Sequence, residues 1–324
     1  MQSIYSVLAI VIPLALLVIL IWKRMNIAVS AILCTALMAL MSGIDVFDCM
    51  TTGYMSAFST YIKNYWLLIF LGSTFGKAMQ ITGAADDVAA LMTKKFGTKY
   101  TVLTLCITTL ILAYGGVSCY VIVFAIYPIA LNMFKRADLP RHLVPAIVAA
   151  GAFTAVNIGP ASPSVVNNIP TTYLGTTPTV LPLWSAFLAA FFFIISTLYC
   201  LWQEKVARKN GEHFSADEET LKLMAEAETR EHGNGIVALI PMVLVVGLLV
   251  VGLNVLWCLL IGIVALLILF WNKLDNKLEF ANCGVTDAMG AIVATSAVVG
   301  FGGVVSLTPG YTVLLDAAMN MKGS

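Results

Sequence analysis

The chain alternates between long apolar runs and short polar breaks. About 17–25 mostly apolar residues cross about 30 Å of hydrocarbon as an α-helix. Runs of this kind predict membrane-spanning helices at 4–22, 27–43, 65–82, 180–202, 236–253, 254–271 and 284–306. The longest polar stretch, 203–234, predicts a linker outside the membrane, and the semi-polar stretch 44–64 predicts a segment at the outer interface.

Composition strengthens the membrane assignment. The 324 residues are 60% hydrophobic and 11% charged, whereas soluble domains are about 45–50% apolar and about 25% charged. This bias excludes a soluble globular protein, a disordered chain and a nucleic-acid binder with a basic face, and the net charge of +1 gives no steering toward acidic partners. The predicted fold class is an all-α polytopic membrane protein whose surroundings are a lipid bilayer. None of the seven cysteines forms a CxxC pair, so no disulfide or zinc framework is expected.

Basic residues orient the predicted spans. With the N-terminus outside, most of the 18 lysines and arginines fall on the cytoplasmic side, as the positive-inside rule requires. Two conditions follow. The segment 100–134 must return to the cytoplasm, either as two spans or as a re-entrant hairpin, and the segment 142–179 must cross once as a broken helix.

The chain also resembles itself. The run from Phe75 to Thr82 is similar to the run from Phe301 to Thr308, and the same shift places 4–22 and 27–43 onto later spans of opposite orientation. Inverted repeats of this kind are typical of secondary transporters. We therefore divide the chain into a first repeat (1–202), a cytoplasmic linker (203–234) and a partial second repeat (235–324). By this arithmetic the second repeat is incomplete by about 100 residues, as a fragment, a split gene or a frameshifted product would be.

Two breaks fall at membrane depth, where irregular backbone is tolerated only if protein buries it or it lines a water-filled cavity. The first is the Gly115-Gly116 pair, which lies between apolar arms. It would let the chain reverse, so that free backbone N–H groups and the Ser118 hydroxyl face a bound anion. The alternative is an ordinary tight extracellular turn between two full spans.

The second break is richer in polar and helix-disrupting residues. It runs from Asn157 through Gly159, two prolines and two serines, and continues at Asn167-Asn168 to Thr172. This stretch is too polar to face lipid, so we predict an unwound helix whose half-helix ends point at a substrate. The alternative is an exposed connector.

Other signals are negative. Asp86, Asp87 and Asp287 lie near span ends and are expected at interfaces, which leaves no clear carboxylate for a coupling proton. Walker, HExxH and GxSxG motifs are absent from the sequence, so no catalytic residue, metal site or cofactor is predicted. The competing classes are a membrane-embedded enzyme, a non-transporting membrane subunit, a channel and a truncated, inactive permease fragment.

Several sequence blocks resemble the gluconate permease family of the ion transporter superfamily. The similarity is most specific over 110–180, in Tyr114-Gly-Gly-Val-Ser, Val123-Phe-Ala-Ile-Tyr-Pro, Lys135-Arg-Ala-Asp-Leu-Pro-Arg, Gly159-Pro-Ala-Ser-Pro and Ile169-Pro-Thr-Thr-Tyr. The resemblance implies an inner-membrane importer of gluconate or a related hydroxy acid by proton symport. It also implies a homodimer with re-entrant hairpins around the substrate.

The resemblance also implies a set of substrate-binding residues. Carried onto this chain, they are Gly115, Gly116, Ser118, Asn157, Ser162, Ser164, Asn167 and Thr171. The chain stops before the second hairpin of that family, so half of the implied site would be missing. The implied partners are a small organic anion and, as coupling ion, a proton.

Overall fold

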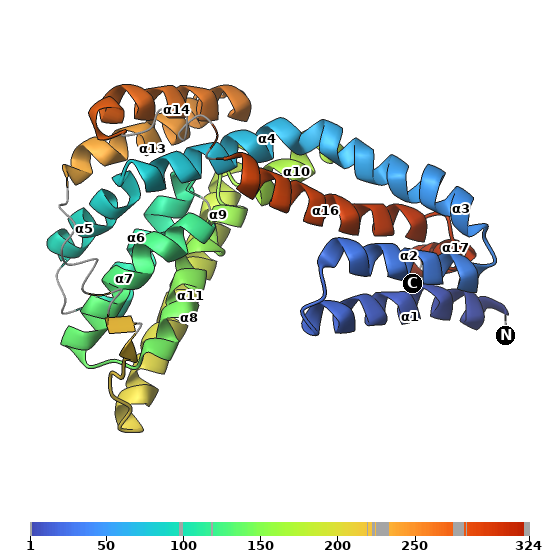
Figure 1. Cartoon of the computed structure of the whole chain (residues 1–324), viewed down its shortest axis with the longest axis horizontal. Helices are drawn as coiled ribbons and strands as arrows, with labels where there is room; N and C mark the ends of the chain where they lie inside the picture. Colours follow the sequence, from blue (N-terminus) through green and yellow to red (C-terminus); the bar gives the residue numbers. More distant parts are fainter. Residues whose placement is uncertain are drawn as a thin grey trace. The chain divides into compact units, whose positions relative to one another are not determined.

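The computed structural model (Figure 1) is helical throughout its regular secondary structure. It describes residues 2–96, 100–117, 119–218, 220–221, 224, 233–274, 282 and 284–320. Among these residues, four helical stretches are long and apolar enough to cross a membrane: Tyr5–Trp22, Arg141–Ile158, Pro182–Lys209 and Val285–Val305. Four shorter apolar helices accompany them, at Ile27–Ser42, Thr101–Tyr114, Gly235–Val250 and Val255–Phe270. The all-helical, polytopic fold class is therefore confirmed.

The chain forms two compact units. Unit 1 comprises Met1–Ile69 and Asp287–Ser324, and unit 2 comprises Phe70–Thr286. Each unit contains helices from both predicted repeats, so the compact units do not coincide with the predicted repeats. The repeat boundaries themselves stay a prediction.

Unit 1 begins with a helical hairpin. Helix α1 (Gln2–Trp22) leads to α2 (Ile27–Ser42), whose first turn is capped by Asn26, because the Asn26 side chain accepts a hydrogen bond from the Ala28 N–H at 2.9 Å. Gly43 ends α2 in the left-handed conformation that glycine adopts readily. The chain then continues through α3 (Val46–Asp48), the π-helical segment η1 (Cys49–Tyr54) and α4 (Met55–Ile81).

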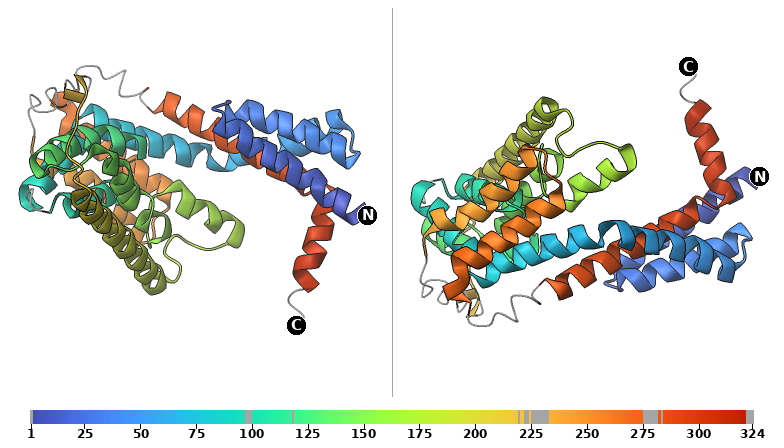
Figure 2. Two further views of the ribbon diagram at one scale, coloured as in Figure 1. Left: turned by 90° about the horizontal axis from the view of Figure 1, so that it is seen from below. Right: turned by 90° about the horizontal axis from the view of Figure 1, so that it is seen from above.

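The predicted interfacial stretch 44–64 is therefore mostly helix that runs directly into the span predicted at 65–82. Helix α16 (Val285–Val305) packs on this stretch through small residues. A Cβ atom on Gly300 would lie 2.7 Å from the Tyr54 ring, and one on Gly53 would lie 2.8 Å from Leu307. Small residues at such contacts let membrane helices approach closely. Helix α17 (Pro309–Asn320) then leaves the end of α16 at a steep angle (Figure 2).

Unit 2 contains the two predicted breaks. Helices α5 (Ala84–Phe96), α6 (Thr101–Tyr114) and α7 (Cys119–Ala137) are followed by the short η2 (Arg141–Leu143) and by α8 (Val144–Ala152). The broken segment contains α9 (Ala155–Ile158) and α10 (Val165–Leu174). The unit is completed by α11 (Pro182–Lys209), the hairpin of α13 (Gly235–Val250) and α14 (Val255–Phe270), and η3 (Trp271–Lys273). Helix α11 runs beyond its predicted end at residue 202.

Helix α6 is short for a span. Its 14 residues cover about 21 Å at 1.5 Å per residue, less than the roughly 30 Å of a hydrocarbon core. It packs closely on α8, because a Cβ on Gly151 would lie 2.6 Å from the Cys106 carbonyl oxygen. Of the two interpretations left open for 100–134, the length of α6 favours the re-entrant hairpin.

The first helix of each predicted repeat packs on a later helix of the other repeat. In unit 1, α17 packs on α1, with Gly310 against the Ser6 main chain. In unit 2, α5 packs on α13, and a Cβ on Gly235 would lie 2.5 Å from the Asp87 carbonyl oxygen. The shift that relates α1 to α13 also relates α5 to α17. Both pairs therefore join the first helix of one predicted repeat to a later helix of the other.

Candidate functional site

The Gly115-Gly116 turn is a helix-terminating motif buried inside unit 2. Gly116 has φ +90°, which favours glycine, and its N–H donates to the Ala113 carbonyl at 3.1 Å. The Val117 N–H donates to the Leu112 carbonyl at 3.1 Å, and the Gly115 N–H donates to Ile111. These bonds form a Schellman-type cap. The expectation of free N–H groups at this turn is therefore wrong for residues 115–117, because the end of α6 uses their donors.

The turn is covered by protein. Gly115 packs against the Met242 side chain of α13, and a Cβ on Gly116 would lie 3.4 Å from Pro163 and 3.5 Å from Phe75. Val117 is 4% exposed. These contacts contradict the alternative of an exposed extracellular turn. Ser118, the remaining residue predicted at this turn, lies outside the described residues.

The second break unwinds the chain between two helical pieces. Helix α8 ends at Ala152, and Thr154 leaves helical geometry with ψ −88°. After α9 the chain is extended at Gly159, takes φ +54° at Ala161 and re-enters helix at Val165. Ser162 in this loop has no exposed surface. The loop is therefore a buried, broken helix, as predicted, and not an exposed connector.

The polar side chains of this loop bond to one another and to the main chain of the same segment. The Ser164 hydroxyl donates to Asn157 Oδ1 at 2.9 Å, and Asn157 Nδ2 donates to the Phe153 carbonyl at 3.0 Å. Asn167 Nδ2 donates to the Gly159 carbonyl at 3.3 Å. The Ser162 hydroxyl oxygen accepts the Ser164 N–H at 3.2 Å. These bonds fix the loop in one shape, which a binding site requires.

Asn168 is a residue that the predicted site left out. It is 4% exposed, and its amide donates both to the Ser162 carbonyl at 3.0 Å and to the Ser164 carbonyl at 2.8 Å. The main-chain carbonyl of Asn168 accepts a hydrogen bond from the Thr171 hydroxyl at 2.7 Å. The adjacent Asn167-Asn168 pair is apparent in the sequence, but only the fold shows that the Asn168 side chain makes the hydrogen bonds that hold the loop.

The two breaks adjoin each other. The Tyr114 hydroxyl, one residue before the glycine turn, donates to the Pro160 carbonyl at 2.6 Å. Gly159 packs directly beneath the same hydroxyl, and Gly116 faces Pro163. The structure thus brings Gly115 and Gly116 together with the loop that contains Asn157, Ser162, Ser164 and Asn167. Thr171 lies one turn further along α10.

The N-terminus of α10 has no side-chain cap. Ser164 is its N-cap residue, but the Ser164 side chain makes no capping bond to the helix, because its hydroxyl bonds to Asn157. The N-terminal end of a helix carries a partial positive charge and unsatisfied N–H donors. An anion at this end of α10 would meet both.

Asp87 is buried by protein. It is 3% exposed and is the one charged side chain in the buried set of the described residues. Its Oδ1 accepts the Gly233 N–H at 2.6 Å. Its position near a span end suggested an interface, but the packing of α13 on α5 covers it. Among the described residues, no group of three or more His, Cys, Asp or Glu side chains could hold a metal ion.

A bundle of apolar helices around a buried, broken helix and a glycine-terminated hairpin arm defines the class of secondary transporters. The family model for citrate transporters matches residues 17–322, and the chain belongs to that family. An uncharacterized transporter of Bacillus subtilis (strain 168), YxjC, is 29% identical over 301 residues, covering 80% of this chain and 63% of that protein. The chain thus spans less than two thirds of this relative's length.

Family membership corrects the resemblance to gluconate permeases, which was wrong. The blocks that suggested it consist largely of glycine, proline, serine and threonine. Any helix broken inside a membrane needs such residues, because they allow turns and satisfy freed backbone groups. They indicate the class of protein and not the family. The chain is therefore a helical, multi-pass member of a family of membrane transporters.

Proposed function

We propose that this protein is a secondary transporter that imports a small carboxylate anion of the citrate type together with protons. One observation carries the proposal: the glycine-terminated end of α6 and the broken segment 153–174 adjoin in the interior of unit 2, through the Tyr114–Pro160 bond. Gly/Pro-broken elements that meet at membrane depth form the substrate sites of secondary transporters. The family's citrate-transporter description supports a carboxylate substrate.

The proposed binding site uses the residues of the broken segment. The N-terminal end of α10 would attract a carboxylate, and the second amide hydrogens of Asn157 and Asn167 would replace its water. Ser162 and Thr171 would hold the loop in shape. Alternating access would move this site between the two faces of the bilayer. An inner-membrane location and a homodimer remain part of the proposal.

Uptake into proteoliposomes tests the function. We expect saturable uptake of radiolabelled citrate that increases several-fold when the outside is made more acidic than the lumen. A neutral sugar should not enter, and gluconate serves as a monocarboxylate comparator. Absence of saturable citrate uptake would overturn the citrate assignment. Uptake that ignores the pH gradient would overturn proton coupling alone.

A further inference from the structure

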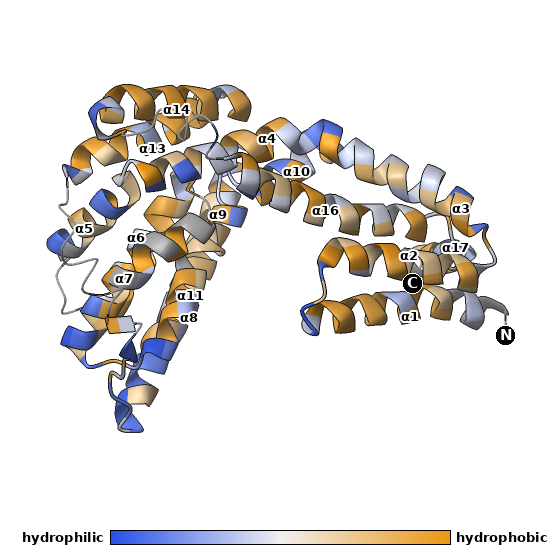
Figure 3. Ribbon diagram, in the orientation of Figure 1, coloured by the Kyte–Doolittle hydropathy of each residue, from blue (hydrophilic) through white to orange (hydrophobic). Residues whose placement is uncertain are grey.

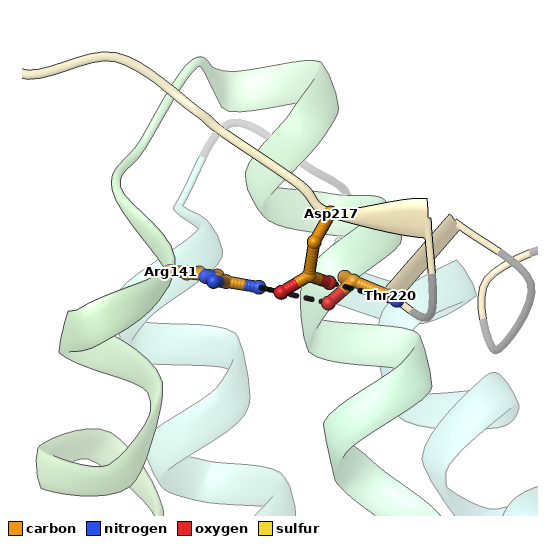
Figure 4. A network of polar contacts seen from close by, with 3 residues as sticks. All are labelled: Arg141, Asp217 and Thr220. Atoms are coloured by element: carbon orange, nitrogen blue, oxygen red, sulfur yellow. Dashed lines mark hydrogen bonds and ion pairs between the residues drawn. The ribbon is translucent and has the colours of Figure 1, made fainter.

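A polar segment that follows α11, here called the strap, binds the turn between α7 and α8. The strap comprises residues 210–218 and Thr220, and the turn comprises residues 138–143. Arg141 Nη1 binds Asp217 Oδ2 at 3.0 Å and the Thr220 hydroxyl at 2.8 Å (Figure 4). Asp217 in turn accepts the Thr220 N–H at 3.0 Å. The Thr220 hydroxyl, then the Thr220 N–H and then Arg141 hold the pKa of Asp217 below its usual range.

Two imidazole–carboxylate pairs join the same two segments. Asp138 on the turn binds His213 Nδ1 on the strap at 2.7 Å and accepts the Phe214 N–H at 3.0 Å. His142 Nε2 on the turn lies 3.5 Å from Glu212 Oε2 on the strap. The bond to His213, followed by that to the Phe214 N–H, lowers the pKa of Asp138 from its ordinary value.

The surrounding charges come from the helices that end here. Helix α11 contributes Arg208, which binds Glu204 at 3.0 Å and the Ala137 carbonyl at 3.2 Å. Other charged residues lie on the same ends and on the strap: Lys135, Arg136, Lys205, Lys209 and Glu218. The hydrophilic residues of unit 2 gather at this end of α7 and α11 (Figure 3). The ends of α7 and α11 and the strap itself thus all contain charged residues.

The turn leads directly into the element that contains the candidate site. Arg141 opens η2, which continues into α8 and then into the broken segment. On the strap side, Thr220 is 5% exposed, and Met224 just beyond it is 3% exposed. Asn132 of α7 also donates to the Met224 carbonyl at 3.5 Å. A strap anchored in this way restrains the end of α8.

We propose that the strap is a pH-sensitive clamp on the turn that begins the site-bearing helix, and that it tightens when His142 and His213 are protonated. An imidazolium binds a carboxylate more strongly than a neutral imidazole does. An imidazole that loses its proton also loses this charge-assisted bond, so the contribution falls as pH rises. The carboxylate contribution is lost only at strongly acidic pH, as pH falls through the lowered pKa of Asp138.

The consequence for transport rests on the proposed function and on the strap lying in the cytoplasm, as its basic neighbours predict. Protons that arrive with the substrate would protonate the two histidines and tighten the clamp. Import would thus slow as the cytoplasmic side becomes acidic.

Amide hydrogen exchange tests the clamp without any transport measurement. The Phe214 N–H reports directly, because its acceptor is Asp138. After correction for intrinsic rates, we expect strap peptides of the full chain in detergent to exchange about two- to five-fold more slowly at about pH 6 than at about pH 8. Peptides from α6 should not change with pH, since they report on the fold.

Variants separate the histidines from a general pH effect. In His142→Gln/His213→Gln the side chains keep N–H donors but cannot gain charge, and we expect the pH ratio to fall to about one. Glu218→Gln, an exposed change on the same strap, should keep the wild-type ratio. A wild-type ratio of one, or an unchanged ratio in the double variant, would overturn the clamp. Both results are independent of whether citrate is transported, so a failure of the proposed function is recognised separately.

Discussion

Asn168→Asp is expected to reduce citrate uptake at least about 100-fold. The Asn168 amide donates to two carbonyl oxygens at 3.0 and 2.8 Å and is almost fully buried. An aspartate carboxylate of the same shape cannot donate, and it would place its negative charge beside both oxygens. Each buried bond lost in this way costs roughly 1–3 kcal/mol, and about 1.4 kcal/mol corresponds to a tenfold change. The measurement is the initial uptake rate per folded protein, with folding followed by fluorescence-detected size exclusion.

The same substitution at Asn254 is the matched control. Asn254 caps α14 by accepting the Leu256 N–H at 2.9 Å, and aspartate accepts equally well at a helix N-cap. Asn254→Asp should therefore transport at the wild-type rate. Uptake by Asn168→Asp within twofold of wild type would show that the Asn168 hydrogen bonds across the broken segment are not needed for transport.

Gly159→Ala is expected to lower uptake by about ten- to hundredfold. The added methyl would meet the Tyr114 hydroxyl and lie 2.8 Å from the Ala155 carbonyl oxygen. The Tyr114–Pro160 bond, which joins the two breaks, would then have to shift. Overpacking of this kind costs roughly 1–3 kcal/mol. The initial uptake rate and the melting temperature in detergent measure the two consequences.

Two comparisons show whether the clash with Tyr114 is the cause. Gly247→Ala in α13 meets no atom within 4 Å and should leave uptake and stability unchanged. Tyr114→Phe/Gly159→Ala removes the hydroxyl that the methyl meets, so it should transport better than the sum of the two single losses predicts. If the losses of uptake in the two single variants simply add in the double variant, the effect of Gly159→Ala does not come from the clash with the Tyr114 hydroxyl.

Much of the fold follows from the sequence, because apolar helices must match bilayer thickness. The runs at 27–43, 236–253 and 254–271 became α2, α13 and α14 within a few residues. The departures have local causes. The stretch 44–64 is helix because small residues such as Gly53 let α16 pack on it. Helix α11 extends past residue 202 because its polar last turns are stabilised by pairs such as Arg208–Glu204.

The candidate site was only partly predictable. Glycine and proline mark where a helix must break, so both breaks were found. What the polar groups bond to depends on packing between distant segments, which spacing along the chain does not reveal. In the sequence Tyr114 looks like the last residue of an apolar run, and only the fold shows that its hydroxyl bonds to Pro160. The strap contacts between Arg141 and Asp217 likewise join residues far apart in sequence.

The central claim is that the buried break after α8 binds the transported anion, and substrate protection tests it most directly. Ser164→Cys, in a background whose seven cysteines are replaced, places one thiol at the N-cap of α10. We predict that citrate slows its modification by a small maleimide, with half-protection near the concentration that half-saturates uptake, while a neutral sugar has no effect. An unchanged labelling rate at citrate concentrations that saturate uptake would contradict the claim.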